Sequence, residues 1–285
     1  MFATLSRSWS LIKASAAVLR SDSELLVFPL ISSVAALLVA ASFLLPLGLI
    51  GGPEALQRQW GEEGGSVAVA LWTFAFYLTQ YFVIFFFNSA LVGAAMIRLK
   101  GGDPTVADGF RIAFSRIGAI FGYALIAATV GLLLRALQQR AGWLGRWVAG
   151  LLGVAWTVAT FLAVPVLVAQ NVGPIEALKQ SASMLKRTWG ENLVGNAGIG
   201  AVGGLLLFAV ILLGGGLAIL AGVQQMPAVA VGIGVLTVII ALLLGLVQAA
   251  LSGIYSAALY RYASEGEAPQ GFDSSQLGAA FRQKG

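Results

Sequence analysis

Side chains that could catalyse a reaction are few in this chain, and they lack the partners that catalysis needs. The sequence contains no cysteine and no histidine. This excludes disulfides, thiolate nucleophiles, haem ligation by histidine and the common zinc sites. It also excludes a histidine general base. The Gly-x-Ser-x-Gly elbow and the GK[ST] phosphate loop are both missing. We therefore expect no enzyme, no metal site and no cofactor.

Carboxylates remain as candidates, because two of them can act together as general acid and base. Asp103 and Asp108, however, stand where a helix is expected to start, and Glu176 and Glu191 flank another predicted helix. Acidic side chains at helix starts complement the helix dipole, which explains their placement without any catalysis.

Uncharged polar residues inside the apolar stretches form a second candidate set. Gln80, Asn88 and Gln248 lie where a bilayer would be dry. They have two interpretations: hydrogen bonds between neighbouring helices, which are common in membrane bundles, or a polar path for a solute. The bounds expected for the spans leave no Asp, Glu, Lys or Arg inside them, which counts against a proton-coupled pump.

The third set combines basic residues with aromatic anchors on three short amphipathic helices, predicted at about 3–20, 104–116 and 174–189. Apolar residues recur there at spacings of three and four, as on one helix face. The candidate headgroup contacts are Arg7, Lys13, Arg111, Lys179, Lys186 and Arg187, and the candidate anchors are Trp9, Phe110 and Trp189. Such helices bind anionic lipid surfaces. They could equally brace the bundle or dock a soluble partner.

Composition places all three sets in a membrane protein. Hydrophobic residues make up 59% of the chain and charged residues only 10%, against roughly 25% charged in soluble domains. The net charge of +5 fits basic loops on the cytoplasmic side rather than nucleic-acid binding.

The longest uncharged run, between Glu191 and Arg261, far exceeds the ~20 apolar residues of one crossing. It predicts two spans joined by a short turn at 223–227, where Pro227 ends a helix. The same rule predicts an all-α fold with six transmembrane helices at about 25–51, 67–96, 117–134, 147–169, 193–222 and 228–260. Together they form one domain over 1–260, followed by a polar cytoplasmic tail at 261–285. Asp103 and Pro104 are expected to start a helix, and Pro165 is expected to kink the fourth span.

The elements repeat as a short amphipathic helix followed by a hairpin of two spans, over about 1–96, 103–170 and 174–260. An even number of crossings per repeat keeps the three amphipathic helices on one side. Most of the 17 Lys and Arg residues fall on that side. The positive-inside rule then places both termini in the cytoplasm.

Five stretches carry a resemblance to a known family: SRSWSLIK at 6–13 with LLVFP at 25–29, FFNSALVGAAMIRLKGGDPT at 86–105, AWTVATFLAVPVLV at 155–168, and GPIEALKQSASMLKRTWGE at 173–191. Together they resemble an uncharacterised prokaryotic family of six-span membrane proteins, a domain of unknown function. More distantly, the chain is similar to the membrane domain of some glycerophosphodiester phosphodiesterases. The resemblance implies a six-span membrane fold and a location in the inner membrane of a prokaryotic cell, but it implies no activity.

These observations lead to two functional hypotheses. The first is a non-catalytic inner-membrane protein that organises lipid or assembles with itself or with partner proteins. Its expected partners are membrane lipids, in particular anionic ones, together with a second copy or another membrane protein, and not nucleic acid. The second is a channel or transporter for a small or amphipathic solute.

Overall fold

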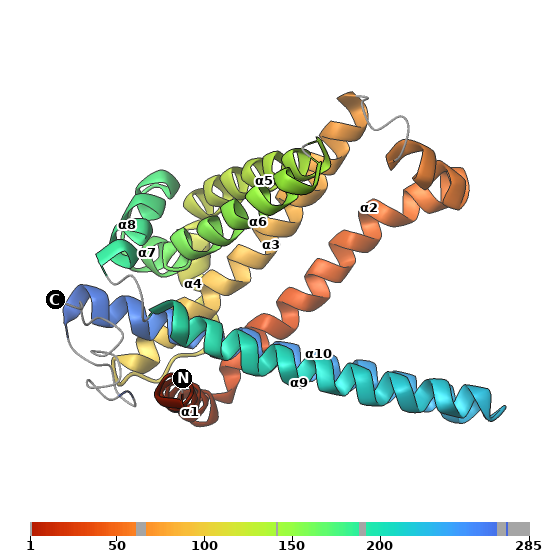
Figure 1. The fold of residues 1–285 in the computed structure, drawn as a ribbon. Helices are drawn as coiled ribbons and strands as arrows, with labels where there is room; N and C mark the ends of the chain where they lie inside the picture. The colour runs from red at the N-terminus through yellow and green to blue at the C-terminus, as the bar shows by residue number, and fades with distance from the viewer. Residues whose placement is uncertain (1, 61–66, 141, 188–191, 267–271, 273–285) are drawn as a thin grey trace. The chain divides into compact units, whose positions relative to one another are not determined.

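The computed structural model describes residues 2–60, 67–140, 142–187, 192–266 and 272, in which every regular element is a helix (Figure 1). Among these residues, six segments are long and apolar enough to cross a membrane: Ser23–Pro46, Val67–Leu99, Ile117–Gln139, Gly145–Ala169, Val202–Val223 and Pro227–Glu265. The prediction of an all-helical fold with six membrane-length helices is confirmed.

The helices of the described chain range from 4 to 39 residues in length. The elements are α1 (Phe2–Ser21), η1 (Ser23–Leu26, a 3₁₀ helix), α2 (Val27–Trp60), α3 (Val67–Leu99), α4 (Val106–Ser115), α5 (Ile117–Arg140), α6 (Gly142–Ala159), α7 (Ala163–Ala169), α8 (Pro174–Arg187), α9 (Asn192–Val223) and α10 (Pro227–Glu265). They form two compact units. Unit 1 comprises Met1–Leu26, Ala95–Asp103 and Arg187–Gly285, and unit 2 comprises Val27–Ala94 and Pro104–Lys186. The single domain predicted over 1–260 stays a prediction.

Unit 1 is built on the hairpin of α9 and α10, against which α1 packs. The turn between the two helices lies where the sequence predicts it: α9 ends at Val223, Gln225 adopts a left-handed backbone with φ of 56°, and Pro227 opens α10. Glycine lets the helices approach, because a Cβ on Gly203 would lie 2.4 Å from the side-chain amide carbon of Gln248.

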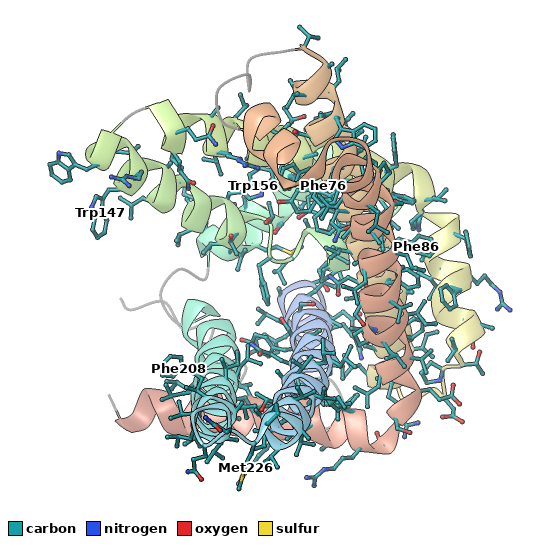
Figure 2. The ribbon with its side chains drawn as sticks, turned by 90° about the vertical axis from the view of Figure 1, so that its right-hand side faces the viewer. Phe76, Phe86, Trp147, Trp156, Phe208 and Met226 are labelled. Atoms are coloured by element: carbon teal, nitrogen blue, oxygen red, sulfur yellow. The ribbon has the colours of Figure 1, made fainter. Side chains whose placement is uncertain are left out.

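The outer side of this hairpin is apolar and exposed along its length. Phe208 on α9 is 63% exposed and lies on the side away from α10, and Met226 lies at the tip (Figure 2). Contiguous apolar surface of this extent is unusual for a water-soluble monomer, and it fits the interior of a bilayer.

Unit 2 packs its helices through small residues and rings. The ring of Phe28 on α2 meets the ring of Phe110 on α4 edge to face, with centroids 5.6 Å apart, and Phe86 on α3 meets Phe114 in the same way. A Cβ on Gly109 would lie 2.4 Å from Cζ of Phe28, so only glycine fits there without displacement.

The helices that extend furthest beyond the predicted span ends are α2 and α5. α2 continues past Gly51 to Trp60, and α5 continues past Leu134 to Arg140. The predicted ends were placed where charged and polar residues begin. Glu, Gln, Ala, Leu and Arg are nevertheless strong helix formers, so the backbone stays helical beyond the apolar zone.

The fourth span is broken rather than kinked at its proline. α6 ends at Ala159 and α7 begins at Ala163, so the regular helix is lost over residues 160–162. Pro165 lies one turn further on. Its ring removes a backbone donor and clashes with the carbonyl four residues earlier, that of Phe161, which places the break before the proline.

Candidate functional site

α8 presents two different faces within unit 2. Ala177, Ser181 and Leu185, four residues apart, form one buried row. Lys179 and Lys186 are exposed on another side of the helix. The apolar stripe predicted on this helix starts at Ile175, which is 61% exposed. Ser181 bonds directly to the fourth span, and Ala177 and Leu185 are buried one turn before and one turn after it.

Ser181 fills the break in the fourth span. Its hydroxyl donates to the carbonyl of Ala159 at 2.7 Å and accepts from the backbone N–H of Leu162 at 3.1 Å. Both backbone groups have lost their usual partners in their own helix: the N–H of Ala163 bonds to Thr160 instead of Ala159, and the N–H of Phe161 takes the carbonyl of Val158. We call this pair of hydrogen bonds the Ser181 bridge.

α4 is similarly divided. Gly109 and Ala113 are buried, while Phe114 is 59% exposed and the Arg111 side chain 78% exposed. Phe110 is half-buried among the rings of unit 2. Arg111 is ion-paired with Asp108 at 2.9 Å, a contact within one turn of the helix.

The start of α4 corrects the prediction that Asp103 and Pro104 open this helix. Thr105 is the N-cap, and α4 begins at Val106. The hydroxyl of Thr105 accepts from the N–H of Asp108, and the Asp108 carboxylate accepts from the N–H of Thr105, which completes a capping box. Hydrogen bonds from the Thr105 hydroxyl and backbone hold the pKa of Asp108 below its ordinary value of 3.8. A reciprocal cap satisfies two helix-start donors, whereas Asp103 pairs with Arg98 instead.

α1 also has a buried row, formed by Leu11, Ser15 and Val18, with Lys13 and Arg20 exposed. The side chains of Arg7, Trp9 and Arg187 lie outside the described part of the structure, as does the whole of Trp189. Their predicted contacts therefore stay predictions.

The C-terminal end of α3 is closed by its own loop. Gly101, with φ of 85°, donates to the carbonyl of Arg98, and Gly102 donates to that of Ile97. These two bonds form a Schellman motif, which leaves the carbonyl of Leu99 to be satisfied from elsewhere.

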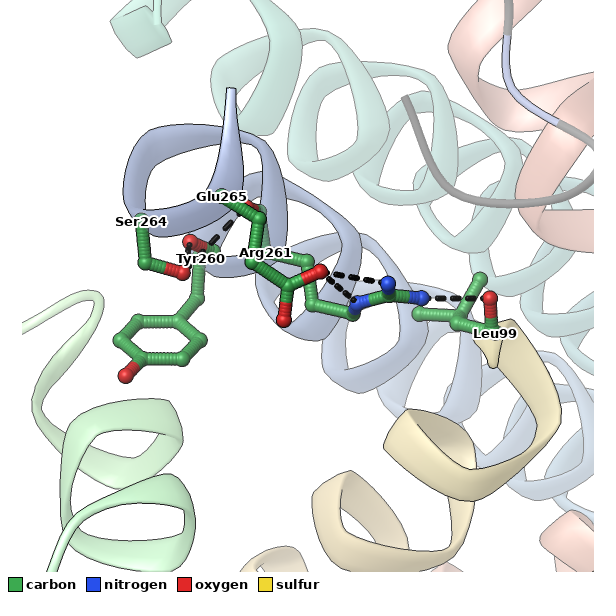
Figure 3. Close-up of polar contacts among 5 residues, drawn as sticks. All are labelled: Leu99, Tyr260, Arg261, Ser264 and Glu265. Carbon is green, nitrogen blue, oxygen red and sulfur yellow. Dashed lines mark hydrogen bonds and ion pairs between the residues drawn. The ribbon is translucent and has the colours of Figure 1, made fainter. Parts of the chain in front are cut away.

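Arg261 of α10 supplies that missing donor (Figure 3). Its guanidinium donates to the Leu99 carbonyl at 2.5 Å and to Glu265 at 3.0 and 2.5 Å. A cation at a helix C-terminus is also favoured by the helix dipole. Within unit 1 this contact ties the end of α3 to the end of α10.

Asp22, at the end of α1, is a buried carboxyl group in unit 1, only 7% exposed. Burial raises the pKa of Asp22 above its ordinary value, and the positive charge of Arg98 partly offsets this rise. One carboxyl oxygen has no hydrogen-bond partner. Arg98 itself donates to the Gly102 carbonyl and to Asp103, so the end of α3 holds a mixed-charge cluster rather than a cationic site.

The intramembrane polar candidates are spread over both units. Gln80 and Asn88 are half-buried on α3 within unit 2, whereas Gln248 lies on α10 in unit 1, over Gly203. The side-chain oxygen of Gln80 and the hydroxyl of Ser89 are buried without a hydrogen-bond partner. The predicted path through Asn88 and Gln248 stays a prediction.

Sequence reasoning missed the position of Arg135, a charged residue inside a membrane-length helix. The hydropathy pattern predicts that Arg135 lies in the loop after the third span, but it lies within α5 and donates to the hydroxyl of Tyr77 on α3 at 2.8 Å. Tyr77 stacks on Tyr81, and Tyr81 on Phe85. The spacing of four between these rings could have indicated a shared face on α3.

Tyr77 and Arg98 are separated by about 30 Å along α3, at 1.5 Å per residue, which is one hydrocarbon thickness. Arg135, which bonds to Tyr77, therefore fits the edge of the apolar zone opposite to Arg98. At such an edge an arginine side chain can reach the lipid headgroups.

The described residues contain no group of three or more acidic side chains that could hold a metal ion. Residues 67–271, well over half of the chain, match the model of a family described as "Family of unknown function (DUF6159)". The chain belongs to this family. Comparison with curated proteins finds no match, and comparison with solved structures finds none either. Membership agrees with the resemblance noted from the sequence and brings no activity with it.

Proposed function

We propose that this member of the family is a non-catalytic membrane protein that organises anionic lipid at the cytoplasmic surface of a prokaryotic inner membrane. The observation that carries the proposal is the two-sided arrangement of α8: one row of residues is buried, while Ile175, Lys179 and Lys186 are exposed. At 100° per residue these three positions lie within about 40° of one another on the helix.

An exposed apolar side chain beside two lysines is the pattern of a helix at the lipid–water boundary. The apolar side chain enters the acyl region, and each lysine attracts anionic headgroups by about 1 kcal/mol. On α4, exposed Phe114 and Arg111 give a second instance of the same combination. Three repeats, each opened by such a helix, would place these surfaces on one side of the membrane.

The test is native mass spectrometry of the full chain released from bilayers that contain phosphatidylcholine and phosphatidylglycerol. We expect bound phosphatidylglycerol to fall when Lys179 and Lys186 are both changed to Glu. Arg146→Glu, a charge reversal at the exposed start of α6, is the matched control and should leave it unchanged. If the double variant retains as much phosphatidylglycerol as the wild type, lipid binding by α8 is refuted.

Assembly with a second copy is a further part of the proposal, supported by the exposed apolar hairpin of unit 1. Gly200 and Gly204 on α9 have nothing within 4 Å of a would-be Cβ, so this small-residue pair is open to another helix. The same spectra would report a dimer or a higher oligomer.

A channel or transporter is the second candidate. The partnerless buried oxygens of Gln80 and Ser89 favour it, because a buried polar atom without a partner is a place where water or a solute could bind. The channel or transporter hypothesis would be supported if the protein passes a solute into vesicles and the Gln80→Leu variant does not. The distant likeness to phosphodiesterase membrane domains stays a prediction.

A further inference from the structure

α8 carries the proposed lipid-binding residues, and its Ser181 bonds to the break in the fourth span. We propose that anionic lipid bound to α8 controls the Ser181 bridge, so that the helix transmits the state of the membrane surface to the broken span. This inference deepens the proposed function and rests on it for the identity of the ligand.

The first step is that the break depends on α8. The carbonyl of Ala159 and the N–H of Leu162 have lost their own-helix partners, and one hydroxyl from α8 satisfies both. Ser181 is fully buried. Water therefore cannot easily replace its hydroxyl while the helix stays in place, and buried backbone groups strongly prefer to be paired.

The second step is that the bridge tolerates little movement. The bridging distances are 2.7 and 3.1 Å, and a contact near 3.6 Å is no longer a hydrogen bond. A serine side chain is too short to follow a moving helix. A displacement of α8 of about 1 Å away from the spans would therefore open both bonds at once.

The third step is that the lipid contacts lie on the same short helix. Lys179 is two residues before Ser181 and Lys186 is five residues after it, and both are exposed. Attraction of these two charges to anionic headgroups holds α8 at the surface, and the attraction weakens with salt or with neutral lipid. The N-terminal end of α8 is fixed against α5, since Pro174 packs on Gly122. Movement of the helix is therefore greatest beyond that end, where Ser181 and Lys186 lie.

Hydrogen exchange at the Leu162 amide, followed by mass spectrometry on the full chain in bilayers, measures the bridge directly. We expect exchange to be roughly ten-fold slower in bilayers with phosphatidylglycerol than in phosphatidylcholine alone, as when one net hydrogen bond is gained. Ser181→Ala should exchange fast in both bilayers, and Ser181→Thr, which keeps the hydroxyl, should restore part of the protection. Ser183→Ala removes an exposed hydroxyl that bonds only within α8, to Gln180, and should behave as the wild type.

The outcomes separate this inference from the proposed function. If bound phosphatidylglycerol depends on Lys179 and Lys186 but Leu162 exchanges equally in both bilayers, the coupling is refuted and lipid binding stands. If Ser181→Ala leaves the amide as protected as in the wild type, the bridge itself is refuted. Should Ser181→Ala fail to fold, the variant with both Lys179→Glu and Lys186→Glu still tests the inference. The inference requires the Leu162 amide of this variant to lose protection only in anionic bilayers. Loss of protection in both bilayers would contradict the inference.

Discussion

The contact between Arg261 and the Leu99 carbonyl gives the sharpest stability prediction. Arg261→Ala removes a charged donor from a carbonyl that the Schellman loop leaves without a helical partner. The Arg261 side chain is only 14% exposed, so water replaces it poorly. Hydrogen bonds to charged groups contribute about 1.5–3 kcal/mol. We expect the free energy of unfolding to fall by about 2–3 kcal/mol.

The ion pair with Glu265 is a separate and smaller contribution. The Glu265 side chain is 41% exposed, and pairs at such positions contribute at most about 1 kcal/mol. Glu265→Gln therefore serves as the matched control, because it removes the ion pair but keeps the bond to Leu99. Unfolding in mixed micelles, followed by tryptophan fluorescence, measures both variants. Equal losses in the two variants, or a loss below about 0.5 kcal/mol in Arg261→Ala, would refute the reasoning.

Three further outcomes are expected. Gly109→Ala should destabilise the protein by about 1–3 kcal/mol in the same unfolding assay, since its Cβ would meet a ring and a carbonyl; Gly118→Ala, with open space around it, should not. The lowered pKa of Asp108 contributes stability above pH 3.8 that is lost as pH falls through the lower folded value. The unfolding midpoint should therefore decline less between about pH 5 and about pH 3 in Asp108→Asn. In this cysteine-free chain, a cysteine at Gln225 should react with an impermeant thiol reagent from outside the cell and one at Lys100 should not; the reverse would overturn the predicted orientation.

The long-range architecture follows from hydropathy because the bilayer imposes one dominant rule: uncharged runs of sufficient length become spanning helices. The turn before Pro227 is the clearest case, since a long apolar run interrupted by two glutamines and a proline has few other places to reverse. Close contacts between helices at glycine residues could be predicted from the sequence only in part. Gly122 packs tightly against Pro174, whereas Gly118, one turn earlier, has open space around it.

The details of the site could not be predicted, because they depend on which helix lies beside which. Ser181 looks like an ordinary polar residue on an amphipathic helix until the broken span is placed next to it. Arg135 looks like a loop residue until α5 is seen to continue beyond the apolar stretch and reach Tyr77. The choice of Thr105 over Asp103 as N-cap depends on a reciprocal pair of hydrogen bonds between Thr105 and Asp108.

The central claim, that α8 lies at the lipid surface, is tested most directly by spin labels on this helix in reconstituted bilayers. A label at position 175 replaces Ile175, the exposed apolar residue, and a label at position 183 replaces Ser183, about 80° away around the helix. We expect the label at 175 to collide preferentially with oxygen, which dissolves in lipid, and the label at 183 with a water-soluble nickel complex. If both labels report the same aqueous surroundings, α8 does not rest on the membrane and the account is wrong.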